Sequence, residues 1–185
     1  ESHFGRRVDC NPYAMFGVVT ARAEQQGRLH LWVANPGTAI PADVLADPNT
    51  VITSRESAGY WVALAVAGTL VNNASFPFEF TRRDGQKYAN TWHGTPLKAL
   101  GRDDNDSPFD YGNVSRNFLQ ATHLLMPSDF TARVLTERYS VSGLEQNTVQ
   151  ITGQARNDVL LRMTPSERSQ LRDRLGIGQD AFVVV

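Results

Sequence analysis

Short apolar runs alternate along the chain with longer segments in which apolar and polar residues mix at helical spacing. Short apolar runs bounded by turn residues indicate buried strands, and the longer mixed segments indicate helices. The predicted strands cover residues 28–35, 50–53, 69–73, 87–92, 122–127, 148–152 and 181–185. The predicted helices cover residues 11–27, 56–68, 115–121, 129–140, 157–163 and 164–176.

This alternation predicts the fold class. Strands that are apolar along their whole length must be covered on both faces. We therefore expect an α/β fold, with a Rossmann-like, mostly parallel sheet and helices on both faces. A chain of 185 residues suits one domain with its own core, so a single Rossmann-like lobe over residues 1–185 is expected.

Local sequence signals mark several helix ends. Asn11 is a candidate N-cap, and Ser128 or Asp129 can cap a second helix. Thr164 followed by Glu167 fits a capping box. In contrast, residues 101–114 are rich in Asp, Asn and Gly and are predicted to form an exposed loop.

Composition narrows the function classes. The chain is 41% hydrophobic and 20% charged, which indicates a globular protein, and its net charge of −1 argues against a broad nucleic-acid surface. The one cysteine, Cys10, excludes a disulfide framework and is interpreted as a packed thiol. The four histidines show no metal-binding spacing, so no metal is predicted. His3 is expected at a mobile terminus, and His30 and His123 are expected to be structural.

A basic stretch, Arg82 to Lys87, surrounds an Asp-Gly pair. It is interpreted as a solvated hairpin, with an anionic polymer or membrane surface as the alternative partner.

The densest stretch is NTWHGTPLKALGRD, residues 90–103. If residues 87–92 form a strand, His93 stands at its carboxyl end, where parallel α/β sheets bind ligands. Thr95 and Pro96 resemble an N-cap and a first helical residue, so a helix is predicted to start there.

Such a helix start would offer an anion site. Its first N–H groups carry partial positive charge and would bind a phosphate. Gly94 leaves room for close approach, and Lys98 adds a positive charge. His93, at the edge of that site, could act as a general base.

Structural readings of the same residues remain open. His93 could simply hydrogen-bond within a tight turn, and Trp92 could be a core or cleft-wall aromatic rather than a stacking platform. Asp103, Asp104 and Asp106 could orient His93, or could belong to a solvated acidic loop.

The stretch TWHGTPLKALGRD resembles the signature of the CDP-glycerol glycerophosphotransferase family, the teichoic acid primases and polymerases. The resemblance extends over nearly the whole chain. It includes SHFGRRVDCNPYAMF, GYWVALAVAGTLVNNASFP, MPSDFTARVL and ITGQARNDVLL. Ala155 departs from the family pattern, which has Pro there, while Arg156, Asn157 and Asp158 are retained. Arg156 could reach a phosphate, whereas Asn157 or Asp158 could merely cap a helix.

The resemblance implies one lobe of a two-lobed, GT-B-like transferase, with the donor-binding lobe supplied in cis or by another chain. It also implies transfer of glycerol phosphate, or a similar polyol phosphate, from CDP-glycerol to a teichoic-acid-like polyol-phosphate acceptor. His93 would be the base, and Trp92, Gly94, Thr95, Lys98 and Arg156 would contact substrate. CDP-glycerol is the donor substrate and no other cofactor is implied. The expected location is peripheral, on the cytoplasmic face of the cell membrane.

Two other functions fit the same sequence. A nucleotide-sugar glycosyltransferase can have the same architecture, because a fold does not determine the reaction. A non-catalytic lobe that binds an anionic polymer is the other alternative.

Overall fold

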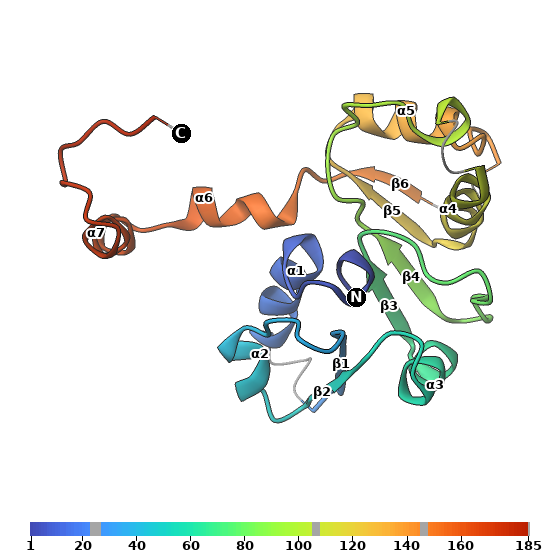
Figure 1. Cartoon of the computed structure of the whole chain (residues 1–185), viewed down its shortest axis with the longest axis horizontal. Helices are drawn as coiled ribbons and strands as arrows, with labels where there is room; N and C mark the ends of the chain where they lie inside the picture. Colours follow the sequence, from blue (N-terminus) through green and yellow to red (C-terminus); the bar gives the residue numbers. More distant parts are fainter. Residues whose placement is uncertain (23–26, 105–107, 145–147, 185) are drawn as a thin grey trace. The chain divides into compact units, whose positions relative to one another are not determined.

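The computed structural model describes residues 1–22, 27–104, 108–144 and 148–184. The chain forms two compact units, Glu1–Ala155 and Arg156–Val185, which are drawn in sequence colours in Figure 1. The first unit contains every strand described below, and the second is helical. The prediction of a single lobe over residues 1–185 stays a prediction.

The strands of the first unit form two parallel sheets. The larger has the order β3-β4-β5-β6, with β3 at Thr69–Asn72, β4 at Lys87–Asn90, β5 at His123–Met126 and β6 at Thr148–Ile151. The smaller pairs β1, His30–Val33, with β2, Thr50–Thr53. All of these pairings are parallel, which confirms the predicted α/β class. Asn72 lies opposite Asn90, so the carboxyl ends of β3 and β4 are side by side.

Helices connect and cover the strands. They are α1 at Cys10–Thr20, α2 at Ala42–Ala46, α3 at Ala58–Val66, α4 at Pro108–Gln120 and α5 at Asp129–Arg138. Helix α5 packs on β5 and β6 (Figure 1). The second unit contains α6, Asp158–Arg162, and α7, Pro165–Arg174.

An aromatic cluster fills the core beside the larger sheet. The Phe76 ring lies 4.8 Å from Phe80 and 5.0 Å from Tyr88, centroid to centroid. Trp92 and Phe118 extend this cluster, with their centroids 5.6 Å apart. Offset and edge-on contacts of this kind stabilise a core beyond the area they bury.

Two helix caps are confirmed and one is wrong. The Ser128 hydroxyl accepts from Thr131 N at the start of α5, and Thr164 and Glu167 form the capping box of α7. The first helix begins at Cys10 with Asp9 as its N-cap, so Asn11 lies inside the helix instead of capping it. The helix also ends at Thr20, well before residue 27.

Three predicted segments are also wrong. Helix α4 begins at Pro108, so the second half of the expected loop 101–114 is helical. A 3-10 turn also occupies Gly101–Asp103. Residues 181–184 form no strand. Strand β4 pairs in parallel with β3, so the Asp-Gly pair before it is not a hairpin turn.

The arginines of that stretch cap helices. Arg83 donates to the carbonyls of Ala65 and Val66 at the end of α3, at 2.8 and 3.0 Å. Arg82 Nε donates to the Gln120 carbonyl at the end of α4, at 2.8 Å. Cations at helix C-termini satisfy carbonyls that lack partners within the helix.

Among the described residues, no helix combines the length and the apolar character needed to cross a bilayer. The described part of the chain also contains no group of three or more His, Cys, Asp or Glu side chains that could hold a metal ion.

Candidate active site

The chain turns sharply where β4 ends. Asn90 Oδ1 accepts from the Trp92 N–H at 2.9 Å, and Trp92 adopts a left-handed backbone with φ +48°. That conformation is uncommon for a bulky residue, and such residues cluster at functional sites. The turn sends the Trp92 ring into the core, where it is 5% exposed, and leaves His93 partly exposed. The structural reading of Trp92 as a core aromatic is thus confirmed.

His93 is oriented by the main chain directly after β3. Its Nδ1 lies 2.6 Å from the carbonyl oxygen of Asn73. A carbonyl can only accept, so Nδ1 carries the proton and the lone pair of the neutral ring lies on Nε2. The ring also stacks on Trp92, with centroids 4.3 Å apart and planes at 27°. A fixed imidazole with a lone pair on Nε2 has the chemistry of a general base.

His3 lies in the same place, contrary to its expected position at a mobile terminus. Its main-chain N–H donates to Asn73 Oδ1 at 2.8 Å. Its ring packs edge-on against His93, with centroids 5.8 Å apart. Nothing in the local sequence signals this contact, because the two histidines are brought together only by the fold.

Asn11 ties three segments together. Its Nδ2 donates to the carbonyls of Thr91 and Trp92, both at 3.3 Å, and to Gln154 Oε1 at 3.0 Å. The side chain is 3% exposed. Helix α1 therefore holds the turn before His93 against the segment that follows β6.

The predicted helix at Thr95 is absent. Residues 91–100 form neither helix nor strand. Gly101 has φ +59°, a left-handed backbone that would end a helix begun at Pro96. The phosphate site can therefore not rest on a helix dipole. A Cβ at Gly94 would meet no atom within 4 Å, so the space beside it is open. Phosphate binding by Gly94 and Thr95 stays a prediction.

Gly101 fixes the end of this stretch. Its φ is +59°, and a Cβ there would lie 2.2 Å from the Arg138 carbonyl oxygen. Only glycine fits this close approach to the end of α5. The stretch from His93 to Gly101 is thereby anchored at both ends.

A pocket of about 420 Å³ lies in the first unit. It is lined by Phe4, Arg55, Ser75, Lys98, Gly101, Asp104, Tyr111, Asn113, Val114 and Tyr139. Phe4 follows His3 in the chain, and Ser75 comes two residues after Asn73, whose carbonyl accepts from His93. Lys98 is exposed and makes no ion pair in the described part of the chain.

Of the three carboxylates that could orient His93, Asp103 and Asp104 lie in the described part of the chain, and their surroundings differ. Asp103 Oδ2 pairs with Nε of Arg138, the last residue of α5, at 3.0 Å. The orienting contact to His93 comes from the Asn73 carbonyl. Asp104 lines the pocket, and its orienting role stays a prediction. Asp106 lies outside the described residues.

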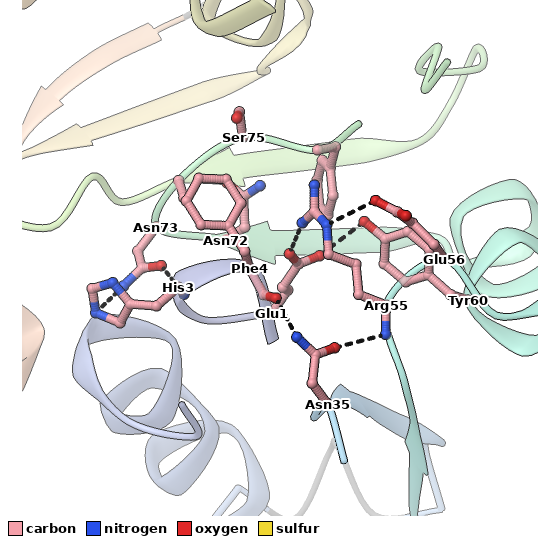
Figure 2. A network of polar contacts seen from close by, with 12 residues as sticks. Glu1, His3, Phe4, Asn35, Arg55, Glu56, Tyr60, Asn72, Asn73 and Ser75 are labelled. Atoms are coloured by element: carbon pink, nitrogen blue, oxygen red, sulfur yellow. Dashed lines mark hydrogen bonds and ion pairs between the residues drawn. The ribbon is translucent and has the colours of Figure 1, made fainter. Parts of the chain in front are cut away.

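Sequence reasoning missed a charged network that includes the pocket residue Arg55, and Figure 2 shows this network. Arg55 pairs with the carboxylate of Glu1, and the Tyr60 hydroxyl donates to the same carboxylate at 3.0 Å. Burial, followed by the Glu1 charge, raises the pKa of Tyr60 far above 10.0, although Arg55 opposes the shift. The hydroxyl thus stays protonated and keeps donating. This network fixes the guanidinium that lines the pocket.

Arg156 lies in the second unit, in a 3-10 turn at Ala155–Asn157, and is exposed. Its phosphate-binding role stays a prediction.

Comparison with known proteins identifies relatives. The chain is 27% identical over 193 residues to a teichoic acid poly(glycerol phosphate) polymerase of Bacillus subtilis, covering 100% of this chain and 25% of that protein. The chain is 24% identical to the enzyme of the same name from Bacillus spizizenii, and this match covers 100% of this chain and 47% of that protein. The chain thus spans less than half the length of these relatives.

Comparison with solved structures also identifies teichoic acid polymerases. The wall teichoic acid polymerase TagF matches with a TM-score of 0.76 at 21% identity, over 97% of this chain and 44% of that chain. A TagF variant soaked with CDPG also matches, with a TM-score of 0.76 at 21% identity. This match covers 97% of this chain and 46% of that chain. These matches show a shared fold.

The model of the CDP-glycerol:poly(glycerophosphate) glycerophosphotransferase family matches residues 1–185, the whole chain. With the parallel sheets and the HGTPLK stretch in place, the chain belongs to this family.

Proposed function

We propose that the chain is the acceptor-side part of a transferase that moves glycerol phosphate from CDP-glycerol to a polyol-phosphate acceptor. Its family membership supports the reaction class, and its relatives are named as poly(glycerol phosphate) polymerases. The observation that carries the proposal is the 2.6 Å contact from His93 Nδ1 to the Asn73 carbonyl, because it leaves the basic lone pair on Nε2.

In the proposed step, an acceptor hydroxyl attacks the phosphorus that bears glycerol. The new oxygen–phosphorus bond forms while the bond to the CMP oxygen breaks, and the hydroxyl proton passes to His93 Nε2. CMP leaves with the electron pair of the broken bond, and the imidazolium later returns its proton to solvent. Positioning and charge stabilisation supply most of the catalysis in phosphoryl transfer.

The pocket lined by Phe4, Ser75 and Lys98 is the proposed acceptor site. Lys98 would attract a phosphate of the acceptor, and Asn113 and Ser75 offer polar atoms for its hydroxyls. Replacing Lys98 with alanine should raise KM for the acceptor about fivefold, since an exposed charge pair contributes about 1 kcal/mol. Lys87→Ala, at the opposite end of β4, is the matched control and should leave KM unchanged.

The donor test uses the protein that contains this chain, supplied with a glycerol phosphate oligomer as acceptor. CDP-glycerol, CDP-ribitol and a UDP-sugar are compared by the release of CMP or UDP. We expect CMP release to be fastest with CDP-glycerol. Faster release of UDP from the sugar donor would overturn the proposal in favour of glycosyl transfer.

The remaining expectations concern the whole protein. We propose that a further lobe binds most of the donor and that the protein works at the cytoplasmic face of the membrane, where a growing polymer would be presented. CDP-glycerol would then be the only nucleotide required.

A further inference from the structure

Asn73 is the residue that both site histidines share. It is fully buried, follows β3 directly, and contacts the two imidazoles with different groups. Its main-chain carbonyl accepts from His93, and its side-chain amide faces His3 (Figure 2). A change of this side chain can therefore alter His3 while the main-chain anchor of His93 stays in place.

The hydrogen bonds fix which way the Asn73 amide points. The His3 main-chain N–H can only donate, and it lies 2.8 Å from Oδ1, so that atom is the oxygen. The other end is then the NH₂ group, which donates to Ser2 Oγ at 3.2 Å and contacts His3 Nε2 at 3.1 Å.

The amide in turn fixes the tautomer of His3. Because Nδ2 can only donate, His3 Nε2 must accept, and the ring proton of neutral His3 lies on Nδ1. Asp9 Oδ1 lies 3.8 Å from the same Nε2, beyond hydrogen-bond range, so the shorter contact with Asn73 decides the tautomer. Asp9 itself pairs with Arg7 at 2.5 Å.

We propose that Asn73 is a positioning residue that gives the two imidazoles different roles, with His93 as proton acceptor through Nε2 and His3 as hydrogen-bond donor through Nδ1. The Nε2 lone pair of His3 is occupied by the Asn73 amide, which prevents His3 from competing for the acceptor proton. His3 thereby contributes an N–H group at Nδ1, next to the ring of His93. Only the catalytic meaning of these roles rests on the proposed function.

The test reads the tautomers directly. Long-range proton–nitrogen NMR spectra of the chain labelled with ¹⁵N-histidine, at neutral pH, should show His3 and His93 both protonated on Nδ1. In Asn73→Asp, a carboxylate oxygen replaces the NH₂ group and cannot donate. His3 should then carry a proton on Nε2, while His93 keeps its proton on Nδ1.

Asn35→Asp is the matched control. Asn35 Nδ2 donates to the Phe4 carbonyl at 3.0 Å, so the same chemical change disturbs the same segment without touching either ring. It should leave both tautomers as they are. If Asn73→Asp does not fold, Asn73→Ala removes the same donor and should also release His3 to the Nε2–H form that histidine favours in water.

Two results would overturn the positioning role: His3 protonated on Nε2 in the unaltered protein, or the same His3 spectrum in all variants. The catalytic part is tested separately in the complete protein. Asn73→Asp should lower kcat for CMP release about tenfold or more relative to Asn35→Asp, because His3 would lose its hydrogen bond to an anionic oxygen of substrate. A switched tautomer with unchanged kcat would refute the donor role of His3. An unaltered protein that releases no CMP would instead refute the proposed function and leave the tautomer result standing.

Discussion

Residues Glu1–Ala155 bury asparagine side chains among aromatic rings, whereas residues 156–184 of the second unit contain no buried side chain. In the first unit, Asn72, Asn73, Asn90 and Asn117 are each at most 1% exposed. The Tyr88 hydroxyl lies 3.1 Å from the Oδ1 atoms of both Asn72 and Asn117. In the second unit, α7 is held by its own capping box. Long-range polar contacts thus shape the candidate site, and local contacts shape the second unit.

The largest expected difference in stability between the units comes from replacing two glycines that share a left-handed backbone conformation. Gly101 and Gly176 have φ +59° and +66°, but only Gly101 is pressed against another segment. Gly101→Ala should destabilise the first unit by about 3–5 kcal/mol, because strain and a backbone clash combine. Gly176→Ala should add only the strain of a left-handed residue, about 1–2 kcal/mol.

Tryptophan fluorescence during urea unfolding separates these outcomes, since Trp32, Trp61 and Trp92 all lie in the first unit. Gly101→Ala should move the fluorescence midpoint and Gly176→Ala should not. Equal shifts for the two variants would contradict the contrast between the units.

A smaller effect is expected from Asn11, the buried donor that joins α1 to the turn before His93. Asn11→Ala leaves two main-chain carbonyls without this partner and should cost about 1–3 kcal/mol. Turnover in the complete protein should fall as well, because the turn that carries His93 loses an anchor. Stability lost with no change in kcat would show that the turn keeps its geometry without Asn11.

In the second unit, Thr164→Ala removes the cap of α7 and should destabilise that helix by about 1 kcal/mol. Amide hydrogen exchange in residues 165–174 should quicken about fivefold, with β3 and β4 unaffected. Ser166→Ala, at the second residue of α7, serves as the control. Faster exchange in the sheet would indicate that the two units are coupled.

The smallest effect is a pH dependence of the same helix. Hydrogen bonds from the Thr164 N–H and hydroxyl hold the pKa of Glu167 below its usual 4.5. A lowered pKa in the folded state means that the carboxylate stabilises α7 above the unfolded pKa, and that this support is lost as pH falls through the folded pKa. Circular dichroism should show helix loss below about pH 4.5 in the unaltered chain, and a smaller loss in Glu167→Gln.

The sequence predicts those features that depend on neighbouring residues. The caps at Ser128 and Thr164 follow local rules and are confirmed. The helix at Thr95 fails because its cap signal has no room for a helix before Gly101, whose close contact with Arg138 is set by the fold. Asn11 looks like a cap in the sequence, but the fold uses its amide as a buried donor.

The candidate site divides in the same way. The motif singles out His93 as a candidate, and its role as a base stays a prediction. The resemblance names the family correctly. The contact between Asn73 and His3 cannot be predicted in this way, since 70 residues separate them in sequence and only the fold brings them together. The network of Glu1, Arg55 and Tyr60 is equally invisible to local patterns.

We propose above all that His93 takes the proton from the attacking hydroxyl of the acceptor substrate. The turnover of His93→Ala tests this role most directly. The complete protein, with CDP-glycerol and a glycerol phosphate oligomer, should lose about 10²–10⁴-fold in kcat for CMP release. His123→Ala is the control, because His123 lies at the start of β5 with its Nδ1 bonded to Thr122. An unchanged kcat in folded His93→Ala would contradict the account.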